Sequence, residues 1–194
     1  MCIRDSVISE HKSKFKTVAE FEAYLAAESK YANKRFEFVN GRIIEKPAMK
    51  QEEFYIAKFL SRLFVKTLAY ANGDELIVES DGHIDEQRKR IADIGYFTEA
   101  QIEAARDGHR FAPALAIEIL SPSEKLEEIE EKINDYFDAG VQLVWYISPK
   151  QEQIYVYTAP DKLTILKGTS VCSAAPVLPD FSFEVGEMFV RKGK

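Results

Sequence analysis

The chain has 194 residues, of which 46% are hydrophobic and 30% charged, a composition typical of one globular domain with a substantial core. No apolar run approaches the roughly 18 residues of a membrane span, and the N-terminus lacks a secretory-signal layout, so a cytoplasmic protein with no membrane partner is expected. Two cysteines and three scattered histidines are too few for a disulfide scaffold or a zinc cluster. The net charge of −6 disfavours a tight, passive DNA binder, because phosphate neutralisation usually requires a basic surface.

The first half of the chain predicts two helices and four strands. Thr17, with a glutamate three residues on, forms a capping box and predicts a helix start, and Asn40-Gly41 between two β-prone runs predicts a hairpin over residues 35–45. A second helix is expected over residues 51–71, ended by Gly73. Strands are expected over residues 76–79 and 90–97, with a turn around Asp81-Gly82.

The second half predicts a strand, a helix and further strands. A short helix from Thr98 precedes the near-continuous apolar run 114–120, which is typical of a strand buried on both faces. A helix from residues 121–123 to Ala139 should bury the stripe Leu126, Ile129, Ile133 and Phe137. The remaining predicted elements are strands over 141–148, 154–158 and 162–166 and a final segment over 185–190. The strand–helix–strand unit implies a parallel crossover and the hairpins imply antiparallel pairs, so we expect one α/β domain with a mixed sheet over residues 17–190. Residues 1–16 form an N-terminal extension, the first six of which resemble a cloning or sequence-assembly remnant.

Three acids lie in predicted strands. Glu118 lies between apolar neighbours on both strand faces, and a buried carboxylate needs a cation, a metal ion or a proton as its partner. Asp93 begins a mostly apolar run, which indicates either a site residue or a residue at a strand end. Glu37 on pattern alone is more typical of the exposed face of an edge strand.

Lys132 lies on the helix that follows Glu118, and Lys125 lies on the same flank seven residues earlier. The plainer interpretation of this helix is a solvated face with pairs such as Glu128 and Lys132. Carboxylates that hold a divalent ion, together with a nearby ammonium, would instead suit phosphodiester hydrolysis.

The order of motifs resembles the Uma-type family of restriction endonucleases, within the PD-(D/E)XK nuclease superfamily. The similarity covers about residues 19–189 and is carried by the motifs at 36–44, 92–94, 117–123, 131–141, 145–147 and 178–181. The resemblance implies a restriction-endonuclease-like fold, a mixed central sheet flanked by helices, with a Mg²⁺ or Mn²⁺ site.

Carried over by position, Glu37 matches the acid of the family's first hairpin, Asp93 the aspartate of its PD motif and Glu118 the acid of its third motif, and all three are candidate metal ligands. Lys132 matches the family's active-site lysine. That lysine has moved from the strand to the helix, since the position two after Glu118 is Leu120. The chain departs from the pattern at Ala92, where proline is usual, and at Gln51, where histidine is common, and neither change removes a proposed ligand.

The resemblance implies a metal-dependent endonuclease that cuts DNA and could act as a homodimer. The alternatives are a nuclease-fold binding or regulatory module with little activity, which the net charge favours, and a metal-dependent phosphodiesterase for RNA or small phosphodiesters. Phosphate contacts would need basic groups, although each candidate could equally be an ordinary solvated residue. The candidates are Lys58, Arg62 and Lys66 on the second helix and Arg88, Lys89 and Arg90 before Asp93.

Overall fold

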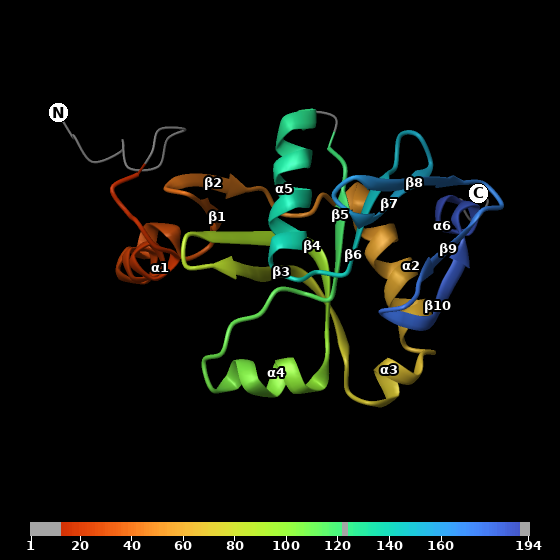
Figure 1. The fold of residues 1–194 in the computed structure, drawn as a ribbon, viewed down its shortest axis with the longest axis horizontal. Helices are drawn as coiled ribbons and strands as arrows, with labels where there is room; N and C mark the ends of the chain where they lie inside the picture. The colour runs from red at the N-terminus through yellow and green to blue at the C-terminus, as the bar shows by residue number, and fades with distance from the viewer. Residues whose placement is uncertain (1–12, 122–123, 191–194) are drawn as a thin grey trace.

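A central mixed β-sheet with helices on both faces forms the framework of the protein in this computed structural model, which describes residues 13–121 and 124–190 (Figure 1). The helices are α1 (Val18–Ala27), α2 (Phe54–Phe64), α3 (Leu68–Ala71), α4 (Glu99–Arg106), α5 (Leu126–Asp138) and α6 (Val185–Phe189), with 3₁₀ turns η2 (Ser29–Tyr31) and η3 (Gln51–Glu53). The strands are β1 (Arg35–Val39), β2 (Arg42–Lys46), β3 (Glu75–Asp85), β4 (Arg88–Phe97), β5 (Leu115–Ile119), β6 (Leu143–Ser148), β7 (Gln153–Ala159), β8 (Lys162–Lys167), β9 (Val171–Ala174) and β10 (Leu178–Glu184).

The main sheet has the strand order β2-β1-β4-β5-β6-β7-β8, and β3 pairs with β4. Among the strands of the described residues, only the β5–β6 pair is parallel, and α5 connects its two strands, as the strand–helix–strand pattern predicted. The other pairs are antiparallel, which confirms the mixed sheet.

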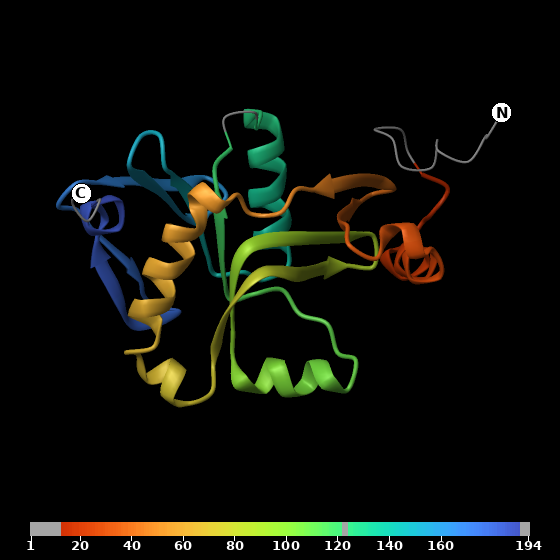
Figure 2. The same cartoon turned by 180° about the vertical axis from the view of Figure 1, so that it is seen from behind.

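Two apolar layers sandwich the sheet, with α5 on one face and α2 on the other (Figures 1 and 2). Ile117 and Ile119 of β5 pack toward α2, α6 and the small β9–β10 sheet, whereas Ala116 packs toward Tyr136 of α5. Strand alternation therefore turns Glu118 toward α5 as well. A third cluster joins the β1–β2 hairpin to α1 through Phe21, Phe36 and Phe38.

Two predicted boundaries in the first half of the chain are wrong. The turn expected at Asp81-Gly82 lies inside β3, and the chain reverses instead at Glu86-Gln87, where the Asp85 carboxylate accepts the Gln87 amide at 2.8 Å. The helix expected over residues 51–71 is divided, because Thr67 accepts the Tyr70 amide at 3.2 Å and caps a separate helix, α3.

The apolar stripe of α5 is also displaced from its predicted position. Leu126 is 64% exposed, and the buried stripe is centred on Ile133 and Tyr136. The helix α5 begins at Leu126, with Lys125 as its N-cap, so the predicted start at residues 121–123 is too early. The presumed remnant at residues 1–6 lies outside the described residues. No helix in the described ranges has the length and apolar character needed to cross a bilayer.

Candidate active site

The predicted acids and the predicted lysine meet in one buried cluster between the sheet and α5. Glu37 comes from β1, Asp93 from β4, Glu118 from β5 and Lys132 from α5, and each is between 2% and 9% exposed. The alternation of β1 explains the position of Glu37, since Phe36 and Phe38 pack against α1 and turn the residue between them the other way.

Glu118 lies at the centre of the cluster with cations on both of its oxygens. Its Oε1 atom lies 3.0 Å from the Lys132 ammonium and accepts a hydrogen bond from the Tyr136 hydroxyl. Its Oε2 atom lies 3.0 Å from the Lys46 ammonium. Burial opposes ionisation, but the positive charges of Lys132 and Lys46 outweigh it and lower the pKa of Glu118 to about 2. The buried carboxylate therefore has the cationic partner that its position required.

Asp93 faces the same ammonium from the neighbouring strand. Its Oδ1 atom lies 3.0 Å from Lys46, and its Oδ2 atom accepts the Ile119 amide at 2.7 Å. Burial and the negative charge of Glu118 raise the pKa of Asp93 to about 6, although Lys46 and the amide act in the opposite direction. The two carboxylates thus share one cation and have opposite pKa shifts.

Glu37 forms ion pairs with two other basic residues of the site, Lys132 and Arg90. Its Oε1 atom accepts the Ile91 amide at 3.1 Å and lies 3.3 Å from Lys132, and its Oε2 atom accepts from Arg90 at 3.0 Å. Burial opposes ionisation, yet Lys132 and Arg90 lower the pKa of Glu37. In this arrangement Glu37 positions Lys132.

The two candidate lysines of α5 lie in different environments. Lys132 is buried against Glu118 and Glu37, and their charges raise its pKa despite the desolvation, so the ammonium stays charged. Lys125 is exposed at the helix N-cap. The structure therefore places Lys132 in the cluster and Lys125 outside it.

Tyr136 and Lys46 both contact Glu118, and neither was predicted from the sequence as a site residue. Lys46 is the unpredicted cation of the cluster. It ends β2 next to Pro47, and a lysine at the end of a hairpin strand is normally solvated. The pairing of β1 with β4 brings this end of the hairpin toward β5, and that long-range contact has no local sequence signal.

Oxygen ligands for a divalent ion are present as a pair. Among residues 13–121 and 124–190, no group of three or more His, Cys, Asp or Glu side chains is arranged to hold a metal ion. Asp93 and Glu118 nevertheless direct one oxygen each toward a common positive charge, and Mg²⁺ can be held by one or two carboxylates with water completing its shell.

The candidate phosphate-binding residues fall into two groups. Arg88 pairs with Asp85, Asp135 and Asp138, and Arg90 is buried against Glu37, Glu131 and Asp135, so both connect the sheet to α5. Lys89 is buried and pairs with Glu22 and Asp81. In contrast, Lys58, Arg62 and Lys66 are exposed on or just beyond α2.

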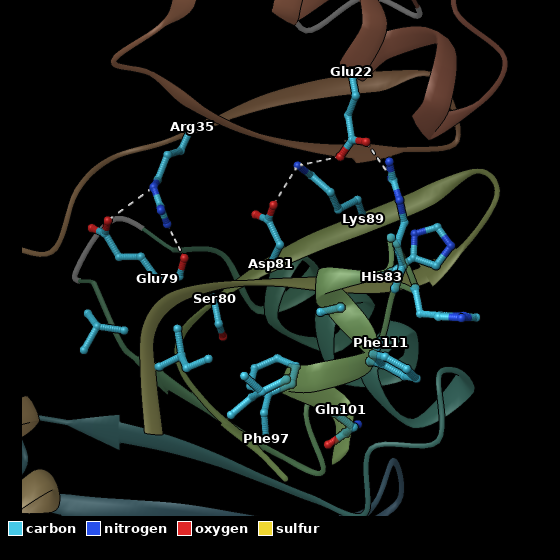
Figure 3. A pocket seen from close by; sticks show the side chains of 17 residues that line it. Glu22, Arg35, Glu79, Ser80, Asp81, His83, Lys89, Phe97, Gln101 and Phe111 are labelled. Atoms are coloured by element: carbon cyan, nitrogen blue, oxygen red, sulfur yellow. Dashed lines mark hydrogen bonds and ion pairs between the residues drawn. The ribbon is translucent and has the colours of Figure 1, made fainter. Parts of the chain in front are cut away.

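A separate hollow of about 620 Å³ lies between β3, β4 and α4 (Figure 3). Its charged groups neutralise one another, since Glu22 bridges Lys89 at 3.1 Å and also pairs with Arg110, and Arg35 pairs with Glu79. The cluster around Glu118 lines no part of this hollow. The acid–lysine cluster is therefore the stronger candidate for a reaction site.

Comparison with known proteins identifies the family and supports the fold. A family model named Uma2 and described as "Putative restriction endonuclease" matches residues 19–186. A solved structure described as a "putative nuclease belonging to DUF820" from Anabaena variabilis ATCC 29413 aligns with a TM-score of 0.72 and 19% sequence identity, covering 89% of this chain and 97% of that chain. At this identity the structural likeness shows the fold alone. No curated protein matches the chain.

Proposed function

The chain belongs to the Uma2 family, and from that premise we propose that it is a Mg²⁺- or Mn²⁺-dependent endonuclease that hydrolyses phosphodiester bonds of DNA. One observation carries the proposal: Asp93 and Glu118 converge on a single cation while Lys132 lies against Glu118. A pair of buried carboxylates with a buried ammonium beside it suits a reaction in which negative charge develops on a phosphate.

Asp93 and Glu118 would hold the divalent ion. The donor set fits, because both are carboxylates, their facing oxygens each lie 3.0 Å from the same ammonium nitrogen, and Glu118 stays ionised at neutral pH. A divalent ion bound there would lower the pKa of a water molecule and offset charge on the phosphate.

The surrounding residues fix the groups that act. Lys132 supplies a permanently charged ammonium that can orient a nucleophilic water or stabilise charge on the phosphate. Glu37, itself paired with Arg90, holds that ammonium in place, and the Tyr136 hydroxyl fixes the Glu118 carboxylate.

We further propose that the protein works in the cytoplasm. We also propose that it forms a homodimer, which would present two such sites to the two strands of a duplex.

A cleavage assay tests this function. Supercoiled plasmid, linear duplex and single strands are incubated with wild type, Glu118→Ala, Lys132→Ala and Lys125→Ala in Mg²⁺ or Mn²⁺. We expect metal-dependent cleavage by wild type and by Lys125→Ala, and a loss of about 100-fold or more in the other two variants, because each removes a group that stabilises charge at the site. Failure of wild type to cleave with either metal, or undiminished cleavage by Glu118→Ala, would refute the proposal.

The competing function is a binding or regulatory module that kept the fold. It is favoured by one feature of the site, namely that each of the three buried acids already has a basic partner without a metal ion. A binding module should slow the migration of DNA in a gel without cutting it. The third alternative, a phosphodiesterase for RNA or small phosphodiesters, is tested by adding these substrates to the same assay.

A further inference from the structure

Lys46 occupies the position that the proposed metal ion would need. Its Nζ atom lies 3.0 Å from Asp93 Oδ1 and 3.0 Å from Glu118 Oε2, so both carboxylates direct one oxygen toward it. An ammonium and a dication in contact with the same two oxygens would repel each other strongly at this short range. One of them must leave when the other binds.

Of the two lysines in the cluster, Lys46 is the one that can leave. Lys132 lies in the middle of α5 between Glu37 and Glu118. The Lys46 side chain comes from the last residue of β2, is 14% exposed, and has a flexible four-carbon stem that can carry its ammonium into solvent.

We propose that Lys46 is a displaceable internal counterion that competes with the divalent ion for Asp93 and Glu118. The proposal rests on the proposed metal dependence. Without metal, the ammonium compensates two buried carboxylates that would otherwise repel each other. When the metal ion binds, the ammonium swings outward to the mouth of the site, where it can pair with a phosphate oxygen of the substrate. Metal binding is weakened by the two ion pairs that must be broken first.

Metal affinity without DNA measures the competition directly. Mn²⁺ is titrated calorimetrically into the full chain of wild type, Lys46→Met and Lys46→Arg, with Lys34→Met as a matched control whose exposed ion pair with Glu45 lies on the same hairpin. We expect Lys46→Met to bind Mn²⁺ about tenfold more tightly or better, equivalent to about 1.4 kcal/mol. Lys46→Arg keeps the competing charge and should retain weak binding, and Lys34→Met should match wild type. Equal or weaker binding by Lys46→Met would overturn the competition.

A second measurement separates misfolding and loss of the proposed function from failure of this inference. Thermal unfolding should show Lys46→Met less stable than wild type in chelator, because two acids lose their counterion, and more strongly stabilised by Mn²⁺. If wild type cuts DNA and binds Mn²⁺ as tightly as Lys46→Met, the function stands and the competition alone is wrong. If no variant binds Mn²⁺, the proposed metal dependence is wrong and the inference is overturned with it.

Discussion

Asp93 and Glu118 share the ammonium of Lys46, but the second oxygen of each carboxylate has different hydrogen-bond and charge partners. Glu118 has a second ammonium, Lys132, and the Tyr136 hydroxyl on Oε1, so its ionised form is favoured despite complete burial. Asp93 has a single amide donor on Oδ2, and burial together with the charge of Glu118 favours its protonated form. The pair therefore consists of one acid that is ionised at all ordinary pH values and one that titrates near neutrality.

Glu118→Gln should destabilise the metal-free protein at neutral pH and do so less as the solution is acidified. The folded-state pKa of about 2 lies below the ordinary value of 4.5, so the contribution of Glu118 is fully present above pH 4.5 and is lost as the pH falls toward 2. The shift corresponds to a contribution on the order of 3 kcal/mol at neutral pH. Urea unfolding of wild type and variant in chelator at neutral and acidic pH measures the difference, and a difference independent of pH would contradict the assignment.

Asp93→Asn provides the internal control, because its sign is opposite. The folded-state pKa of about 6 lies above the ordinary value of 3.8, so ionisation of Asp93 costs stability. Wild type should lose stability relative to Asp93→Asn as the pH rises from about 4 to about 6. If the stability difference from wild type changed with pH in the same direction for both variants, the cause would be a general effect of acid and not the different surroundings of Glu118 and Asp93.

At the scale of the elements, ion pairs as well as apolar contacts join β4 to α5. Arg90 is buried in β4, where its guanidinium reaches Glu37 on β1 at 3.0 Å and Asp135 on α5 at 2.6 Å. Arg88 reaches Asp135 from the same strand at 2.7 Å. These contacts hold α5, the helix that carries Lys132, against the sheet, so Arg88 and Arg90 support the site instead of extending toward solvent.

Arg90→Met should destabilise the fold by about 3–5 kcal/mol, because it leaves the buried carboxylates of Glu37 and Asp135 without their shared cation. Arg62→Met, an arginine substitution at an exposed helix position, should change stability by less than about 0.5 kcal/mol. Chemical unfolding of the three proteins under identical conditions gives both values. Comparable small effects of the two substitutions would show that Arg90 does not hold α5 to the sheet.

The elements also show which parts of the site can be predicted from the sequence. Glu118 could be identified because an acid within an apolar strand needs a partner, and that requirement is local. To choose Lys132 over Lys125 from helix geometry, one must know which side of α5 faces the sheet. The predicted apolar stripe placed that side wrongly, because it included the exposed Leu126. Lys46 could not be identified, since its partners lie 47 and 72 residues further along the chain and only strand pairing brings them together.

At the scale of the whole molecule, the distribution of charge matters more than its sum. The net charge of −6 includes acids that are consumed in internal ion pairs, such as Glu37, Asp135 and Glu131. On the other face of the sheet, α2 and the residue two positions beyond its end present three exposed basic side chains, Lys58, Arg62 and Lys66. A locally basic surface can bind a polyanion even when the whole chain is acidic.

Replacement of Lys58, Arg62 and Lys66 by glutamate should therefore weaken DNA binding and reduce its salt dependence. Each lost phosphate contact lowers the slope of log affinity against log salt by about 0.9, so the triple variant should lose about 3 from that slope. Fluorescence anisotropy with a labelled duplex over a range of salt concentrations, in a Glu118→Gln background without divalent metal, measures both quantities. Lys162→Glu with Lys167→Glu, at exposed positions of β8, is the control and should leave the slope nearly unchanged. If the β8 variant loses as much affinity as the α2 variant, the attraction comes from net charge alone, and α2 is not the phosphate-binding surface.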